Sequence, residues 1–261
     1  MGSKCYIIRY GEIAIKGKNR HLFERFLVDN IKKMLLKYKL YFNKIERVYG
    51  RMILFSDDDC SNCLKNIFGI VSFSLALKSL DINEALKFYT GGSFRVSTQR
   101  ISKDYPFTSQ EMNEKIGGMI IKETGAKVDL KNFDCEIGVE IIGKDFFFFN
   151  KRMKGLGGLP VGVEGKVGVY CEGKESLVAA YLIMKRGCEA LFFGKNIDVS
   201  LLDKYTPYDQ KISKNTPKNI VAIITQDTIK KLRKHDFKMT VLRPLIGLDD
   251  GQIKKLQNFI A

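Results

Sequence analysis

The sequence predicts a chain of mixed architecture, with an α+β region first and an α/β region last. Its 261 residues leave room for two or three domains, each with its own core. Over roughly the first 80 residues, short apolar runs alternate with a helical pattern, as in a ferredoxin-like unit. After a glycine-rich stretch, alternating strand and helix patterns predict a small parallel sheet flanked by helices.

The first region is predicted from the period of its apolar residues. Residues 4–10 alternate apolar and polar side chains like a strand. A helical period of about 3.6 residues then runs from Leu22 to Leu35, and Asn19 stands where the N-cap belongs. Beyond Gly50 we expect a strand, a helix with three aspartates in its first turn and a second strand, at residues 51–56, 57–68 and 70–77.

A second α+β stretch begins near Asp81. A helix over 81–89 leads into a strand over 93–100, and Ser109 is expected to cap the next helix. Strand-like runs follow at 135–142 and 145–152.

Two features of these first regions allow a functional and a structural interpretation. The phenylalanines Phe146 to Phe149 could stack on bases, but an extended strand turns two to each face of a sheet, which favours packing. Cys60 and Cys63 have the spacing of a redox or zinc pair. The chain has only two histidines that could complete a metal site. The structural interpretation is therefore favoured, in which both cysteines lie in a helix and Cys63 packs inward. We predict no metal.

The last region follows a segment dense in glycine, residues 155–165, which we expect to connect domains. Strand patterns then occur in KVGVYC, EALFF, NIVAIIT and MTVLRP. Helical patterns occur in KESLVAAYLIMKR and DTIKKLRK, and from Asp249 onward.

The charge is strongly positive and unevenly distributed. The formal net charge is +15; residues 1–51 carry 13 basic against 4 acidic residues, residues 52–165 carry 14 against 15, and residues 166–261 carry 17 against 10. Such a balance indicates a polyanionic partner, most often nucleic acid, because each neutralised phosphate releases counterions. The alternative is a set of solvated lysine faces without a partner.

Other classes of protein are not supported. No apolar run of roughly 18 residues or more occurs, and charge interrupts the N-terminus after a few apolar positions, so we expect neither a membrane span nor a signal peptide. The six cysteines are too sparse for a disulfide scaffold. These observations predict a cytoplasmic protein.

Six segments of the chain carry a resemblance to a known family. They are RYGEIAIKGKNR (9–20), FGIVSFS (68–74), FRVSTQRISKDYPFTSQEMNEKIG (94–117), GLGGLPVGVEGKV (155–167), LIMKRG (182–187) and VLRPLIG (241–247). Taken together and in order, they resemble the tRNA 4-thiouridine synthetases, which are tRNA sulfurtransferases. The resemblance implies a ferredoxin-like domain (1–80), a THUMP RNA-binding domain (81–152), a connector (153–165) and a Rossmann-like PP-loop ATP pyrophosphatase domain (166–261).

The loop that holds ATP phosphates in this family differs here. The family reads Ser-Gly-Gly-x-Asp-Ser, whereas this chain has Cys171, Glu172, Gly173, Lys174, Glu175 and Ser176. Such a loop binds phosphate through backbone N–H groups and tolerates no competing negative charge. We therefore expect a degenerate nucleotide loop, in which Glu172 repels phosphate. Two alternatives are that Lys174 offsets Glu172, or that the two glutamates hold Mg²⁺.

Two further departures concern sulfur transfer. In the family, the sulfur-carrying cysteine lies beyond the segment matched by VLRPLIG, and in this sequence no cysteine follows Cys188. We also expect no rhodanese domain, which some members have. Residues 194–219 look shortened. We therefore expect a tRNA-binding protein without intrinsic sulfur transfer, with no cofactor and no assigned catalytic residue. The alternative is an active ATP-dependent tRNA sulfurtransferase that uses ATP and Mg²⁺.

The partner implied by the resemblance is tRNA, bound near its acceptor stem. A homodimer, as family members often form, and a separate catalytic tRNA-modification protein are further partners consistent with the sequence. Lysines suit backbone phosphates and arginines can bind two oxygens at once. The RNA-binding residues we predict on this basis are Lys16, Lys18, Arg20, Arg95, Arg100, Lys103, Lys151, Arg152 and Lys154.

Overall fold

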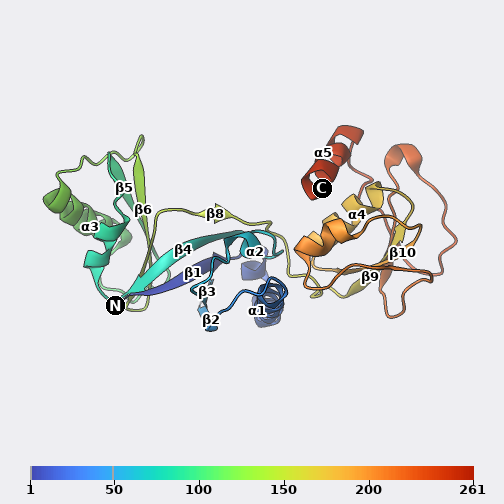
Figure 1. Ribbon diagram of the computed structural model, residues 1–261, viewed down its shortest axis with the longest axis horizontal. Coiled ribbons are helices and arrows are strands. Elements are labelled where there is room, and N and C mark those ends of the chain that lie inside the picture. The colour runs from blue at the N-terminus through green and yellow to red at the C-terminus, as the bar shows by residue number, and fades with distance from the viewer. Residues whose placement is uncertain (1, 49) are drawn as a thin grey trace. The chain divides into compact units, whose positions relative to one another are not determined.

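The computed structural model describes residues 2–48 and 50–261 (Figure 1). The chain divides into two compact units. Unit 1 runs to Tyr10 and continues through Leu40–Lys65 and Val71–Lys154; unit 2 comprises Gly11–Lys39, Asn66–Ile70 and Gly155–Ala261.

Unit 1 is built on one eight-stranded sheet with the order β2-β3-β1-β4-β7-β6-β5, and β8 pairs with β4 at the side. Its pairs are antiparallel except β5 and β6, which run parallel. The strands are β1 (Ser3–Arg9), β2 (Lys44–Val48), β3 (Arg51–Phe55), β4 (Ser72–Ser79), β5 (Phe94–Arg100), β6 (Cys135–Ile142), β7 (Asp145–Phe149) and β8 (Met153–Lys154).

The two faces of this sheet are separated by the alternation of its side chains. Helix α3 (Ser109–Thr124) and the 3-10 helix η3 (Ile82–Phe88) cover one face, where Phe146 and Phe148 join the core. Phe147 and Phe149 point to the other face and pack with residues of β1, β3 and β4. All four phenylalanines are buried, which confirms that they serve packing.

Two predicted helix starts in unit 1 are corrected. The N-cap of α3 is Thr108 and not Ser109, because the Thr108 hydroxyl accepts the Glu111 N–H while the Glu111 carboxylate accepts the Thr108 N–H. Helix α2 spans only Ser61–Lys65, so the three aspartates precede it. One of them, Asp59, accepts hydrogen bonds from Ser61 N–H and the Tyr6 hydroxyl. Cys63 lies in this helix and is buried, as predicted, whereas Cys60 is buried but precedes the helix.

Unit 2 contains a five-stranded, all-parallel sheet with the order β11-β10-β9-β12-β13. This confirms the predicted reduced Rossmann-like architecture. Its strands are β9 (Lys166–Cys171), β10 (Glu189–Gly194), β11 (Ile212–Ser213), β12 (Ala222–Ile224) and β13 (Val241–Leu242).

Helices cover one face of the parallel sheet. Val167, Val169 and Cys171 of β9 face the core formed with α4 (Glu175–Lys185) and α5 (Asp250–Ile260). On the opposite face, Phe193 and Ile223 pack with Phe237, which lies in the loop between β12 and β13. The predicted helix in that loop is wrong: only one 3-10 turn forms, η5 (Ile229–Lys231). The helix predicted from Asp249 onward is confirmed, and Asp249 is its N-cap, in a capping box with Gln252.

Helix α1 (Arg20–Lys37) also belongs to unit 2. The Asn30 side-chain amide donates to the carbonyl oxygen of Val161 at 3.0 Å, and Lys33 Nζ lies 2.8 Å from the Tyr208 hydroxyl. At the end of the helix, Lys37 Nζ donates to the carbonyl of Asp203 at 3.1 Å. Helix α1 is therefore fixed to the glycine-rich segment, to η4 (Ser200–Tyr205) and to Tyr208 beyond it. Among the described residues, no helix has the length and apolar character required to cross a membrane.

Candidate nucleotide loop and nucleic-acid interface

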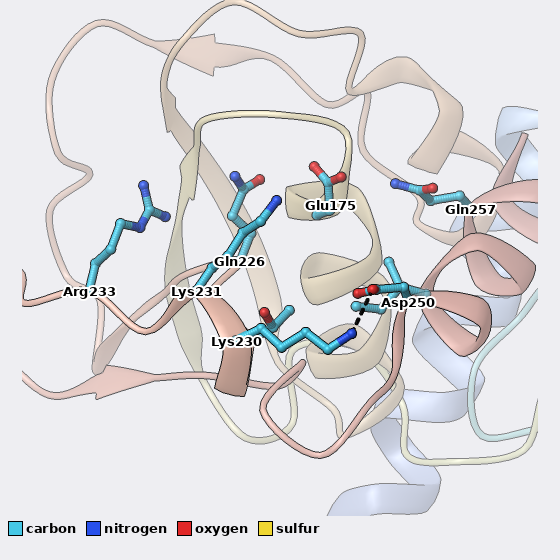
Figure 2. A pocket seen from close by; sticks show the side chains of 9 residues that line it. Glu175, Gln226, Lys230, Lys231, Arg233, Asp250 and Gln257 are labelled. Atoms are coloured by element: carbon cyan, nitrogen blue, oxygen red, sulfur yellow. Dashed lines mark hydrogen bonds and ion pairs between the residues drawn. The ribbon is translucent and has the colours of Figure 1, made fainter.

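A cavity lies at the carboxyl edge of the parallel sheet in unit 2 (Figure 2). From β9 the chain adds β10 and β11 on one side, then crosses to add β12 and β13 on the other. Ligands of such sheets bind where this reversal occurs, outside the carboxyl ends of the strands. The cavity, of about 530 Å³, is lined by Glu175, Gln226, Thr228, Lys230, Lys231, Arg233, Asp250, Ile253 and Gln257.

The loop after β9 is held by Arg233, which lies in the loop between β12 and β13. Arg233 donates from Nη1 to Glu172 Oε1 at 2.7 Å and from Nη2 to Glu172 Oε2. The same guanidinium donates to Asp227 Oδ1 from Nη2 at 2.9 Å. Glu172 is thus paired in a two-pronged contact, the stronger kind of arginine–carboxylate interaction.

Asp227 is the buried centre of this cluster. His235 Nε2 lies 2.7 Å from its Oδ2, and Arg243 Nε donates to the same oxygen at 3.2 Å. Burial on its own would raise the pKa of Asp227, but hydrogen bonds from His235 and Arg233 outweigh it and leave that pKa below the ordinary value. The Asp227 carboxylate therefore fixes the loop from residue 227 to residue 243 in place of the predicted helix.

These contacts revise the expected electrostatics of the loop. The charge of Glu172 is balanced by Arg233, which sequence reasoning missed, and not by Lys174, which is exposed. The described residues contain no grouping of three or more acidic, histidine or cysteine side chains suited to a metal ion. Repulsion between Glu172 and a phosphate is consequently weaker than an unpaired carboxylate would give. Glu172 and Ser176 of the loop both have partners within the protein.

Two other residues of the loop, Cys171 and Ser176, are buried. Ser176 is fully buried: its hydroxyl donates to Gln226 Oε1 at 2.8 Å and accepts the Glu172 N–H at 3.2 Å. Burial raises the pKa of the Cys171 thiol to about 11, so this cysteine is not a reactive thiolate. A Cβ on Gly173 would lie 3.0 Å from Glu175 Oε2, which places that carboxylate over the loop.

The cavity carries cations that the predicted site did not include. Lys230 Nζ lies 2.9 Å from Asp250 Oδ2, and Lys231 and Arg233 extend from the same loop (Figure 2). The helical pattern of DTIKKLRK concealed them, because a regular helix would have distributed these side chains around its axis. The run of basic residues was the available signal.

Two of the three predicted RNA-binding residues of unit 2 already contact other side chains of the protein. Arg20 Nε donates to Glu24 Oε1 at 2.7 Å, one turn along α1. Lys16 Nζ lies 3.5 Å from Glu164 and 4.5 Å from the ring centre of Phe23. Lys18 is exposed.

In unit 1, two predicted arginines have internal partners. Arg95 Nη2 donates to Glu136 Oε1 at 2.8 Å, and its guanidinium lies 4.0 Å from the ring centre of Phe133. Arg100 Nη1 donates to the carbonyl oxygens of Tyr105 and Phe107 at 3.1 and 3.0 Å, which holds the loop after β5. The remaining predicted side chains, Lys103, Lys151, Arg152 and Lys154, are exposed.

Comparison with known proteins places this geometry in a family. The ThiI ferredoxin-like domain matches residues 5–74 and the THUMP domain matches residues 74–149. A probable tRNA sulfurtransferase of Methanocaldococcus jannaschii is 30% identical, with 98% of this chain and 87% of the relative covered. The chain belongs to the probable tRNA sulfurtransferase family. A Bacillus velezensis member is 35% identical, over 98% of this chain and 69% of its own.

Members of this family differ from the chain in length. The alignment with the Methanocaldococcus protein runs over 334 positions, although the chain has 261 residues, so the relative has residues within the aligned span that this chain lacks. A probable tRNA sulfurtransferase of Thermoanaerobacter sp. is 37% identical over 203 residues. The chain spans about half of that relative, 52% of its length.

Two solved structures of similar fold have been found. PH1313 from Pyrococcus horikoshii is 29% identical, has a TM-score of 0.84, and is matched over 100% of this chain and 99% of its own. A 4-thiouridine synthetase–RNA complex with bound ATP is 24% identical with a TM-score of 0.78, over 99% of this chain and 85% of its own. At 24% identity, this second similarity shows that the two proteins share a fold.

Proposed function

We propose that this protein binds tRNA near the acceptor stem and carries out no ATP-dependent sulfur transfer of its own. The THUMP and ferredoxin-like domains support RNA binding, as does the net charge of +15. The observation that carries the second part is the pairing of Glu172 with Arg233 in the loop after β9. A protein of this kind would present tRNA to a separate catalytic protein.

The physical reason is that an ATP phosphate would have to replace contacts that already exist. A phosphate at the loop needs free N–H groups and a close backbone approach. Here the Glu172 N–H is bonded to Ser176, and the Glu172 carboxylate occupies the Arg233 guanidinium. Breaking such a pair leaves a partly buried charge without its partner, which is costly.

The second candidate is an active ATP-dependent tRNA sulfurtransferase. It is favoured by the cavity of about 530 Å³ at the reversal of the sheet, where nucleotides bind in related architectures. Glu175, which stands where the family has aspartate, also lines this cavity. In this alternative ATP and Mg²⁺ would be required.

Two titrations separate the candidates. Fluorescence anisotropy with labelled tRNA at several salt concentrations should show binding that weakens steeply with salt, since each phosphate contact contributes about one unit to the log–log slope. Calorimetry with Mg·ATP should show affinity no better than about millimolar. Salt-independent binding, or none at low salt, contradicts the first part. Micromolar ATP binding favours the active enzyme.

A further inference from the structure

One buried carboxylate in unit 1 is surrounded by more positive charge than it can balance. Glu140 of β6 is fully buried. Its Oε1 accepts from Arg9 Nε and its Oε2 accepts from Arg51 Nε, each at 2.6 Å. Both oxygens therefore have a close arginine partner, and the two guanidinium groups already exceed the carboxylate by one charge.

A third arginine stands beside this pair and has no close acidic partner among the residues that the structure describes. Arg152 Nη2 lies 3.7 Å from Glu140 Oε1, and its side chain is 52% exposed. A long contact of an exposed side chain with an already neutralised carboxylate contributes little. Arg152 therefore remains available to an anion from outside.

An aromatic ring positions these arginines. The guanidinium carbons of Arg9 and Arg152 lie 4.9 and 6.0 Å from the ring centre of Phe149. The ring has room because residue 138 of the neighbouring strand is glycine, where a Cβ would collide with it. The electron-rich faces of aromatic rings attract cations.

One nitrogen of this cluster lacks a partner. Arg9 Nη2 is buried and has no hydrogen-bond partner in the part of the chain that the structure describes. Burial lowers the pKa of Arg9 to about 10; Glu140 acts in the opposite direction, while Arg152 and Arg51 add to the lowering. An anion near Arg152 would reduce the repulsion among the three guanidinium groups.

We propose that Arg152 binds a backbone phosphate of RNA on this face of the sheet. The buried Arg9 and Glu140 and the partly buried Arg51 are the positioning residues that leave its charge free. The proposal rests on the proposed function of tRNA binding. A guanidinium can donate two parallel hydrogen bonds to a phosphate, and the exposed Lys151 and Lys154 extend the positive surface along the chain.

Among the four arginines predicted to bind RNA, Arg152 differs from the others in its contacts. Arg20 is bonded to Glu24, Arg95 to Glu136 and Arg100 to backbone carbonyl groups. A phosphate would have to displace those partners. At Arg152 it displaces only a contact of 3.7 Å.

The test compares Arg152→Gln with Lys122→Gln in the full chain, using a labelled tRNA transcript and fluorescence anisotropy. Lys122 is an exposed residue of α3, which covers the opposite face of the sheet. Arg152→Gln should weaken binding about tenfold or more and reduce the salt slope by about one unit. Lys122→Gln should weaken it less than about twofold and leave the slope unchanged. The melting temperature should be unaffected in both.

Each outcome decides a separate point. Equal small losses in the two variants, with tRNA binding intact in the wild type, overturn the role of Arg152 and leave the proposed function standing. A loss of affinity with an unchanged salt slope also overturns it, because it indicates altered structure and not a lost phosphate contact. Absence of tRNA binding by the wild type rejects the proposed function itself. Arg152→Lys, which keeps the charge, should keep the slope and part of the affinity.

Discussion

Two buried acids, Glu140 in unit 1 and Asp227 in unit 2, are each surrounded by several basic side chains, but the surrounding charge differs. Around Asp227, the charge of Arg233 also satisfies Glu172, so two acids meet two arginines, with His235 as a further hydrogen-bond partner. Around Glu140, one acid meets three arginines.

The difference shows that a buried acid surrounded by basic side chains can have a structural role or support the binding of an anion. A charge-balanced cluster fixes the chain and offers an incoming anion little, because each cation already has a partner. A cluster with surplus cations is stabilised by its two close ion pairs and still presents an unbalanced guanidinium to solvent. We therefore expect the cluster around Asp227 to have a structural role and the arginines around Glu140 to bind an anion.

The largest expected effect is on stability, from Glu140→Gln. The variant leaves Arg9 and Arg51 close together without a carboxylate, and should lower the free energy of unfolding by about 3–5 kcal/mol. Urea denaturation followed by circular dichroism measures this. The matched control is Glu136→Gln, whose side chain is 35% exposed in its pair with Arg95 and should cost no more than about 1 kcal/mol. Equal losses would mean that burial of Glu140 does not matter.

A second prediction tests whether Asp227 is the centre of a fixed structure. Asp227→Asn should lower stability near neutral pH by about 2–3 kcal/mol. The folded protein holds the pKa of Asp227 below its unfolded value, about 3.9. The stabilisation is therefore complete above that pH and is lost as the pH falls through the folded pKa. Denaturation curves should show wild type and variant converging in acid; a constant difference at all pH values would contradict this.

A third prediction converts the balanced cluster into one with surplus charge. Glu172→Gly removes one acid from Arg233, and should raise the affinity for Mg·ATP or pyrophosphate about tenfold, equivalent to about 1.4 kcal/mol. Adding Cys171→Ser and Glu175→Asp should increase the gain by restoring the family's loop. Calorimetry measures both, with Lys174→Gln as a control that leaves Arg233 paired. No gain in either variant would mean that the loop charge is not what limits binding.

The smallest expected effect on affinity concerns an arginine with internal partners. Arg100→Ala removes hydrogen bonds to the Tyr105 and Phe107 carbonyls and should cost about 1–2 kcal/mol of stability. Affinity for tRNA should fall less than about threefold, corresponding to well under 1 kcal/mol. Thermal denaturation and anisotropy provide the two values. A strong loss of affinity without a loss of stability would return Arg100 to the RNA interface.

Local patterns were sufficient to predict much of this fold. β9 and α4 follow directly from an apolar run and a helical period, and the Asp249 cap of α5 is a local hydrogen-bond motif. The cap of α3 could not be placed to the residue, since adjacent Thr108 and Ser109 are both good caps. Only the backbone conformation distinguishes them.

The candidate sites depended on contacts between distant residues. Glu172 and Arg233 are 61 positions apart, and Arg9 and Glu140 are 131 apart. No local pattern shows that these charges meet, so the sequence predicted Glu172 as a source of repulsion and gave Arg152 the same standing as Arg20 and Arg95. Pairing, which the fold determines, separates an available cation from an occupied one.

The most direct test of the central claim is pyrophosphate release from Mg·ATP by the protein saturated with tRNA. The balanced cluster at the loop after β9 predicts no release above that of tRNA and ATP without protein, while anisotropy in the same samples shows tRNA bound. Release that depends on both tRNA and protein would contradict the account and establish an active ATP-using enzyme.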